Sequence, residues 1–220
     1  EEVAHRKTFG HWEFDSVIGK AKGQKQSILT LTERKTRFEI ILRTQAKTSA
    51  ATVAALHKII RQFPHGTFQT ITVDNGSEFQ DCHGMEHDRH GNKRLTVYYA
   101  HPYSSWERGT NERNNRIIRR YFPKGKSLAK VTQKQCDAVA ASINAMPRKV
   151  LNWHTAQELF EQEIANFGIR SKLIYKKLFA LGLTIFREQL SGRRTGLRLC
   201  KGEKRGILHN SKKQPHPHNE

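Results

Sequence analysis

The spacing of apolar residues changes once along this chain, and that change restricts the possible folds more than any other feature. Between residues 10 and 43, apolar and β-branched residues form three runs of strand length, at residues 12–18, 28–31 and 38–42. Polar connectors of hairpin length separate these runs. From residue 48 to residue 63 the apolar residues recur at helical spacing instead. This order predicts an antiparallel three-stranded meander followed by an amphipathic helix.

The chain after the first helix predicts two more strands and three more helices. Residues 68–73 have strand character and end at Asp74-Asn75-Gly76, a turn whose Asn and Gly tolerate positive φ. Residues 78–94 are polar and predict an irregular loop before a strand at 95–100. Helices are expected at residues 110–122, 132–146 and 155–163, the second opened by a Thr132 and Gln135 capping box. The fold class is therefore α/β, with a mixed sheet flanked by helices.

Helical spacing also predicts which side chains of the helices face the core. The expected inner faces are Val53, Leu56, Ile60 and Phe63 in the first helix, Ile117, Ile118 and Tyr121 in the second, and Cys136, Val139, Ile143 and Met146 in the third.

Charge is the strongest constraint on the partner. The 220 residues hold 39 Lys and Arg against 20 Asp and Glu, a formal net charge of +19, which favours a polyanion and argues against small neutral substrates. Three cysteines form no even disulfide framework and no paired metal knuckle, so a reducing compartment is expected. The longest mostly apolar run, residues 178–186, is about half of the ~20 residues that cross a bilayer. We therefore expect a soluble protein.

Composition also predicts the domain organisation. Residues 165–220 carry 13 Lys and Arg against 3 Asp and Glu, and from residue 191 onward they are too rich in Gly, Lys and Arg to bury a core. The prediction is a catalytic domain over residues 1–164 and a basic tail over residues 165–220 that is largely disordered or non-native. Because the chain opens at Glu1 without an initiator Met, we expect it to be an excerpt of a longer protein.

Three acidic residues stand out by their places in the predicted elements. Asp15 lies in the first strand, Asp74 closes the strand after the first helix, and Glu112 opens the helix after the last strand. If the first strand is central, the three carboxylates converge, and their repulsion requires a cation; oxygen ligands favour Mg²⁺ or Mn²⁺. Two such ions support phosphoryl transfer. Taken singly, each acid is more often a solvated charge or a turn former.

Four sequence blocks resemble the DDE transposases of the insertion-sequence-thirty family. They are GHWEFD at residues 10–15, TVDNGSEF at 72–79, YAHPYSSWERGTNE at 99–112 and YFPKG at 121–125. The resemblance covers residues 10–163 and implies a retroviral-integrase-like core with a ribonuclease H-like fold. It implies Asp15, Asp74 and Glu112 as the catalytic, metal-binding triad with two Mg²⁺ or Mn²⁺ ions.

The resemblance also implies the reaction and its partners. The reaction would be cleavage of the ends of a DNA element, followed by transfer of its 3′-hydroxyl into target DNA. The partners would be DNA and further copies of this chain, in the cytoplasm of a prokaryote near the nucleoid. Relatives carry a helix-turn-helix segment before the catalytic domain that recognises the element's ends. Nothing before Gly10 is long enough to supply one.

Several residues near the triad leave alternatives open. Glu107 competes with Glu112 for the third place, and Glu112 matches the family's block. Glu13 alternates with Asp15 and is expected to be structural. The ligand types of Cys82, His83, His87 and His90 allow zinc, but their spacing matches no paired knuckle. His101, Tyr103 and Trp106 are expected to pack beneath the helix rather than to stack on a base.

A basic helix face follows Glu112. Arg116, Arg119 and Arg120 lie four, seven and eight residues further on and share its face, although relatives often have Gly at position 116. A solvated helix face is the alternative to a DNA-binding one. The residues expected to contact DNA phosphates are Arg113, Arg116, Arg119, Arg120, Lys124 and Lys126.

Two other functions remain open on the sequence alone. A structure-specific nuclease on the same ribonuclease H-like fold would use the same triad to hydrolyse strands without joining them. An inactive, truncated remnant would bind DNA through charge alone, without any dependence on divalent metal.

Overall fold

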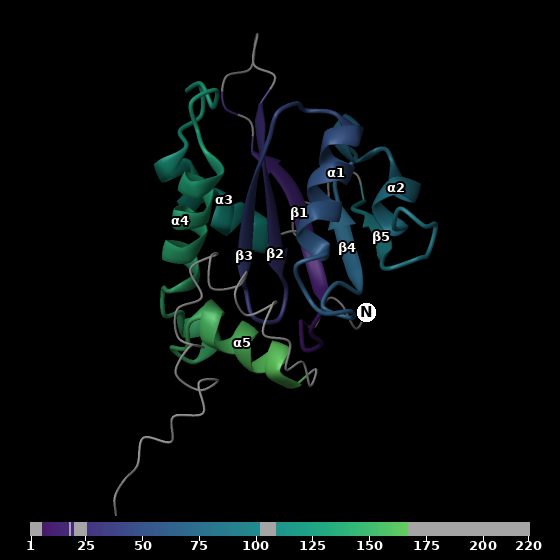
Figure 1. The fold of residues 1–220 in the computed structure, drawn as a ribbon. Coiled ribbons are helices and arrows are strands. Elements are labelled where there is room, and N and C mark those ends of the chain that lie inside the picture. Colours follow the sequence, from purple (N-terminus) through teal and green to yellow (C-terminus); the bar gives the residue numbers. More distant parts are fainter. Residues whose placement is uncertain (1–5, 18, 20–25, 102–108, 167–220) are drawn as a thin grey trace, which may run out of the picture. The chain divides into compact units, whose positions relative to one another are not determined.

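The computed structural model describes residues 6–17, 19, 26–101 and 109–166, with the backbone alone for residues 109–113. Ten helices and strands of this part are labelled in Figure 1. In chain order they are β1 (His11–Val17), β2 (Ser27–Glu33), β3 (Glu39–Thr44), α1 (Ser49–Ile60), β4 (Thr70–Val73), α2 (Cys82–Glu86), β5 (Thr96–Tyr99), α3 (Gly109–Tyr121), α4 (Gln133–Asn144) and α5 (Ala156–Asn166).

The five strands form one mixed sheet with β1 at its centre. The strand order is β3-β2-β1-β4-β5. The strand β1 pairs antiparallel with β2, and β2 pairs antiparallel with β3, which is the predicted meander. On its other side β1 pairs parallel with β4, and β4 pairs parallel with β5. The predicted α/β class, the mixed sheet and the central place of the first strand are therefore confirmed.

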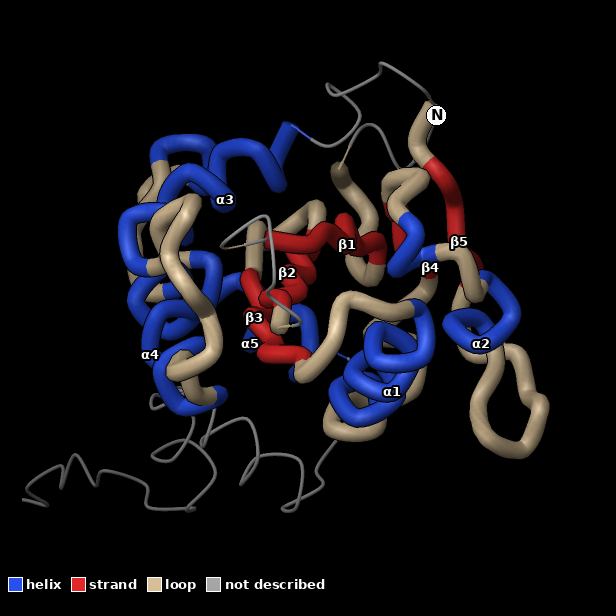
Figure 2. Tube along the Cα trace, turned by 90° about the horizontal axis from the view of Figure 1, so that it is seen from above, coloured by secondary structure: helices blue, strands red, loops and turns tan. Residues whose placement is uncertain are grey.

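Alternation along β1 divides the core into two parts. Trp12 and Phe14 are fully buried on the face covered by α1 and α5, where an aromatic cluster surrounds Phe160. Val17 faces the other side, toward apolar residues of α3 and α4. Figure 2 shows α1 and α4 on opposite sides of the strands. Because Asp15 lies two residues before Val17, the two side chains share a face of the strand, and the side chain of Asp15 lies on the α3 side of the sheet.

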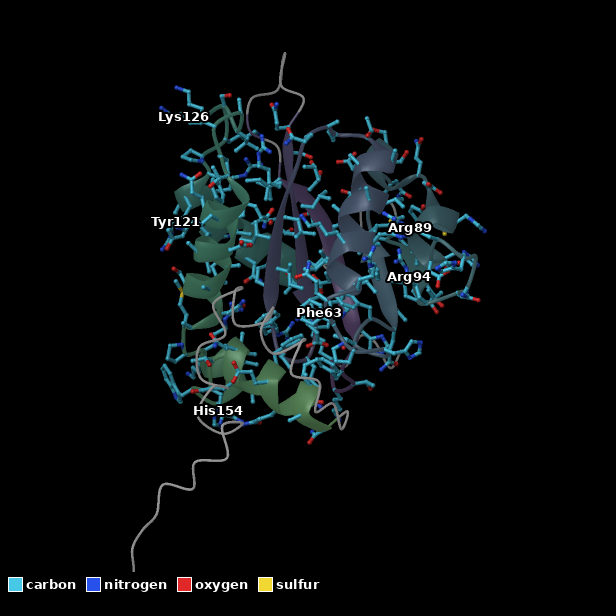
Figure 3. All side chains as sticks on the ribbon, viewed as in Figure 1. Phe63, Arg89, Arg94, Tyr121, Lys126 and His154 are labelled. Carbon is cyan, nitrogen blue, oxygen red and sulfur yellow. The ribbon has the colours of Figure 1, made fainter. Side chains whose placement is uncertain are left out.

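The predicted inner faces of the helices are confirmed in α4, where Cys136, Val139 and Ile143 are buried, and in part in α1 and α3. In α1 the buried residues are Thr52, Leu56 and Ile59, while Val53 and Ile60 are only partly buried. Tyr121 and Met146 are exposed rather than buried, and Figure 3 shows Tyr121 at the outer side of α3. Ile118 and Phe122 fill the inner face of α3 together with a polar residue, Asn114. Apolar periodicity misplaced this face because Asn114 occupies part of it.

The sequence signals at helix ends and in the connecting segments can be compared with the structure. The Thr132 and Gln135 capping box that opens α4 is confirmed. Residues 78–94, predicted as an irregular loop, contain part of a one-turn 3₁₀ helix (Ser77–Phe79), the helix α2 and a bridge between His87 and Lys93. Among the described residues no helix combines the length and apolar character that a membrane span requires. The tail at residues 167–220 lies outside the described residues, and the division at residue 164 stays a prediction.

Side chains of α4 cover the free edge of β3. Asn144 accepts a hydrogen bond from the Glu39 backbone N–H and donates one to the Glu39 carbonyl, both at 2.8 Å. Gln133 does the same further along, accepting from the Arg43 N–H at 2.8 Å and donating to the Ile41 carbonyl at 2.9 Å. These amides take the place of a neighbouring strand. They also fix the position of α4 along the sheet.

Replacement of Asn144 by Ala tests this edge. Asn144 is 3% exposed, so its loss leaves the Glu39 N–H and C=O buried without partners. We expect the free energy of unfolding to fall by about 2–4 kcal/mol, measured by urea denaturation. The control Ser142→Ala removes an exposed hydroxyl of the same helix that bonds only within α4, and is expected to change stability by less than about 0.5 kcal/mol. Equal effects of the two substitutions would contradict the role of Asn144.

Candidate active site

The parallel register of β1 and β4 brings two predicted site residues to one level. Trp12 pairs with Ile71 and Glu13 with Thr72. Two residues further along each strand the register reaches Asp15 and Asp74. Neighbouring strands lie about 4.8 Å apart, so the two Cα atoms lie near one another at the carboxyl ends of adjacent strands. Residues 59 positions apart in the sequence therefore meet, as the prediction required.

Asp15 is held by its own strand and by α3. Its Oδ1 accepts a hydrogen bond from the Ser16 N–H at 2.8 Å, and its Oδ2 accepts one from Asn115 Nδ2 at 2.7 Å. Asp15 is half-buried. Asn115 was missed by the sequence reasoning, because an Asn inside a polar helix gives no signal of its own. Its place three residues after Glu112 was the available clue.

Asp74 begins a tight turn directly after β4. Its Oδ1 accepts a hydrogen bond from the Gly76 N–H at 2.9 Å. The turn does not use the tolerance of Asn75 and Gly76 for positive φ, because Gly76 has φ −64° and Asn75 is not left-handed. Glycine is required at position 76 because a side chain would not fit there. A Cβ atom at position 76 would lie 2.8 Å from Asp74 Oδ1 and 2.8 Å from Glu78 Oε2. Glycine therefore permits two carboxylates to flank one turn.

The third predicted carboxylate is placed by its backbone alone. Glu112 lies in the first turn of α3, the helix that packs on β1 and carries Asn115 to Asp15. Its side chain lies outside the described part of the chain, as do the side chain of Arg113 and the whole of Glu107, Tyr103 and Trp106. The choice between Glu112 and Glu107 therefore stays a prediction.

Glu78 is a fourth acid at this edge, and the sequence reasoning missed its importance. It is 3% exposed and lies in the 3₁₀ helix after the Asp74 turn. Its Oε1 accepts a hydrogen bond from Ser16 Oγ and lies 3.4 Å from Lys47 Nζ. Its Oε2 is buried and has no hydrogen-bond partner among the described residues. The only signal in the sequence was its position inside the TVDNGSEF block.

The donor set at this edge fits a hard divalent cation. Carboxylate oxygens of Asp15 and Asp74 are the ligands that Mg²⁺ and Mn²⁺ prefer. The unpartnered oxygen of Glu78 adds buried negative potential that lacks a compensating donor. Within the described residues no three acidic, His or Cys side chains converge closely enough to hold a metal by themselves. Among the described residues, Asp15 and Asp74 are the carboxylates at this edge that could hold such a cation.

A buried polar network fixes α3 on the sheet. Asn114, 1% exposed, donates to Glu39 Oε2 at 2.6 Å, and Thr32 donates to the same oxygen at 2.6 Å. Arg148 donates to Asn114 Oδ1 at 3.4 Å. Burial raises the pKa of Glu39 to about 8, although the hydrogen bonds from Thr32 and Asn114 lower it. Asn114 lies two residues after Glu112, so this network also determines where the first turn of α3 lies.

The raised pKa of Glu39 predicts how stability depends on pH. The folded protein keeps Glu39 protonated up to about pH 8, whereas the unfolded chain releases the proton above pH 4.5. Rising pH therefore favours unfolding between these values, by at most about 1.4 kcal/mol per pH unit. We expect Glu39→Gln to remove this dependence in urea denaturation from pH 5 to pH 9. The variant Glu163→Gln, at a surface ion pair with Lys35, should keep the wild-type slope.

The predicted basic residues lie along α3 and the turn after it. Arg116, Arg120, Lys124 and Lys126 are exposed. Arg119 is half-buried; burial lowers its pKa, and the charge of Asp15 raises it. Arg119 is therefore the residue of this set that is electrostatically coupled to Asp15.

The other residues considered near the triad are Glu13 and the histidines of the segment around α2. Glu13 is fully buried, and its Oε1 lies 3.3 Å from Arg34 Nε, which accounts for a structural role. His83 and His87 stack with ring centroids 4.2 Å apart, and His87 Nδ1 contacts the His83 carbonyl at 3.1 Å. The described residues of this segment form no metal-binding group.

Comparison with known proteins shows that part of this chain resembles a known domain family. Residues 5–105 match a family model described as the integrase core domain. The match ends after Asp15, Asp74 and the strand β5, so it covers two of the three predicted carboxylates.

Several curated relatives of this chain are described as transposases of insertion sequences. A probable transposase for the element IS1161 of Streptococcus salivarius is 38% identical over 73% of this chain and 44% of its own length. The transposase InsI for IS30C of Escherichia coli is 38% identical over 74% of this chain and 41% of its own length. The chain spans less than half the length of these relatives. The resemblance to the insertion-sequence-thirty family, predicted from four blocks, is confirmed.

Solved structures show the same fold. The catalytic core domain of BIV integrase matches with a TM-score of 0.53 and 18% identity, over 73% of this chain and 99% of that one. A chain of the simian T-cell lymphotropic virus intasome matches with a TM-score of 0.53 and 17% identity, over 68% of this chain and 53% of that one. The predicted retroviral-integrase-like, ribonuclease H-like fold is thereby confirmed.

Proposed function

We propose that this integrase core domain is the catalytic part of a transposase that cuts and joins DNA strands. One observation carries the proposal most directly. Asp15 and Asp74 reach the same level at the carboxyl ends of adjacent parallel strands, and α3 brings Asn115 within 2.7 Å of Asp15. Glu112 opens that same helix. The similarity to insertion-sequence transposases supports this reaction class.

In this proposal Asp15, Asp74 and Glu112 hold two Mg²⁺ or Mn²⁺ ions. When bound, such ions activate an attacking oxygen and stabilise a leaving oxygen in phosphoryl transfer. The chain's own residues prepare the site. Asn115 and the Ser16 N–H orient Asp15, the Gly76 N–H orients Asp74, and Asn114 fixes the helix that carries Glu112.

The substrate in this proposal is DNA, bound first through its phosphates. The exposed cations of α3 and the following turn lie on the helix that reaches Asp15, so a DNA backbone along them would pass the carboxylates. Arg113 belongs to the proposed set by its position in the sequence. Joining two element ends requires coordination between active sites, which supports a homo-oligomer in the active complex. The similarity to a chain of a viral intasome agrees with such an assembly.

Strand transfer tests the reaction and the triad. A pre-cut, labelled duplex is incubated with plasmid and Mn²⁺ or Mg²⁺, and joined products are measured. We expect Asp15→Asn, Asp74→Asn and Glu112→Gln each to lower joining by at least about 100-fold, and Glu107→Gln to leave it near the wild-type level. All four substitutions remove one negative charge, so Glu107→Gln is the matched control.

Each of the other possible results would support a different assignment of the third ligand or of the function. Loss with Glu107→Gln alone would transfer the third ligand to Glu107. Nicked plasmid without joined product would indicate a nuclease. DNA binding without any metal-dependent product, unchanged by Asp74→Asn, would indicate a remnant that binds through charge alone.

Salt dependence tests the basic helix. The double substitution Arg116→Gln and Arg120→Gln should weaken duplex binding and reduce the slope of log K against log salt by roughly 0.9 for each phosphate that is no longer neutralised. Arg89→Gln is the control. Arg89 is exposed beside α2, well away from the Tyr121 and Lys126 end of α3 in Figure 3, and its removal should leave the slope unchanged. Equal slopes for both variants would place the DNA elsewhere.

A further inference from the structure

Glu78 occupies an unusual position for a buried acid. Its side chain is 4% exposed, and its two oxygens have different surroundings. Oε1 accepts from Ser16 Oγ and faces Lys47 Nζ at 3.4 Å, whereas Oε2 is buried with no hydrogen-bond partner in the described part of the chain. A buried acceptor without a donor costs about 1–3 kcal/mol, and more when it is charged. Most buried side-chain acceptors in folded proteins have a hydrogen-bond partner, so an oxygen without one calls for an explanation.

The free oxygen of Glu78 points toward the Asp74 turn. Glu78 Oε2 and Asp74 Oδ1 both lie 2.8 Å from the point that a Cβ atom at Gly76 would occupy. The glycine thus leaves two carboxylate oxygens on the two sides of one small space. Like charges so placed repel each other, and the Lys47 ammonium, 3.4 Å from Oε1, offsets part of this repulsion without donating to Oε2.

Ser16 connects the same acid to the other catalytic strand. Its N–H donates to Asp15 Oδ1 and its hydroxyl donates to Glu78 Oε1. One half-buried residue therefore joins the end of β1 to the turn that follows β4. Ser16 thus links the position of Glu78 to that of Asp15.

We propose that Glu78 is a positioning residue of the cation site, and that its Oε2 accepts a hydrogen bond from a water molecule of the bound divalent cation. This inference rests on the proposed function, which places that cation on Asp15 and Asp74. Mg²⁺ keeps several of its waters in protein sites, and carboxylates outside the ligand set orient such waters. The cation supplies the positive charge and the donor that Oε2 lacks. Glu78 thereby raises the affinity of the site without being a ligand.

Thermal unfolding with added cation tests the inference without measuring catalysis. The full chain is melted in EDTA and then over a series of MgCl₂ or MnCl₂ concentrations, and the concentration giving half of the maximal shift in Tm is recorded. We expect Glu78→Gln to melt in EDTA at or above the wild-type temperature, because its amide can donate to Asp74 Oδ1. We expect its half-saturating cation concentration to rise at least about tenfold.

Two variants control for charge and for shape. Glu163→Gln removes one carboxylate that pairs with Lys35 at 2.7 Å, away from the site, and should titrate like the wild type. Glu78→Asp keeps the charge and should recover at least part of the affinity. If Glu78→Gln titrates like Glu163→Gln, or only lowers Tm in EDTA, the inference is wrong and Glu78 is structural.

A further variant separates this inference from the proposed function. Asp74→Asn should abolish the cation-dependent shift. If the wild type shows no shift, or Asp74→Asn keeps it, the cation site itself is misplaced and the role of Glu78 falls with it. A normal shift in the wild type, lost in Asp74→Asn and unchanged in Glu78→Gln, overturns the role of Glu78 alone.

Discussion

The parallel pairing of β1 with β4 is the interaction on which the rest of this structure depends. It joins a strand from the amino-terminal meander to one that follows the first helix, so it closes the sheet around β1. Side chains reinforce the pairing at its start, where His11 Nδ1 lies 2.7 Å from Thr70 Oγ1 and Trp12 Nε1 donates to the Thr67 carbonyl at 2.8 Å. A one-residue slip would place Asp15 on the level of Val73 or Asn75 and turn the carboxylates to opposite faces.

The two faces of the sheet are held by different kinds of interaction. The α1 face is apolar and aromatic, with Trp12 and Phe38 packed on Phe160. The α3 face carries buried polar groups, among them Thr32, Glu39 and Asn114. Apolar packing tolerates small rotations of a helix, whereas directed hydrogen bonds fix its rotation and its position along the axis. The helix that carries the proposed third carboxylate, Glu112, is therefore the one docked through Asn114.

The site has a consistent electrostatic arrangement. Acidic groups gather at the carboxyl ends of β1 and β4, while exposed arginines and lysines follow on α3 and the next turn. The net charge of +19 attracts a polyanion over a distance, and the local negative charge selects the cations that the chemistry needs. Arg119 lies where the two regions meet, since its pKa responds to Asp15. In the proposed function, such a boundary would bring phosphates and divalent cations to the same place.

The sequence by itself determined the elements and the fold class, and it indicated candidate site residues. Each depends on local information: strand and helix periods, the Thr132 capping box, and the block around Asp74. It also indicated Asp15 and Asp74 correctly as residues that meet, because each lies at a recognisable place in a strand. The inner face of α3 was predicted in part: Ile117 and Ile118 pack on the core, whereas Tyr121 is exposed and the buried Asn114 does not follow the apolar period. The crowding of Gly76 by Glu78 could not be predicted, because a turn motif does not show it.

Only the tertiary structure decided how these residues are held. Asn115 reaches Asp15 across 100 positions of sequence, Asn114 reaches Glu39 across 75, and Ser16 reaches Glu78 across 62. Polar contacts at such separations leave no periodic trace in the chain, because each needs only one donor and one acceptor at the right end of a packed element. The burial that raises the pKa of Glu39 and leaves Glu78 Oε2 without a donor likewise arises only when helices close over the sheet.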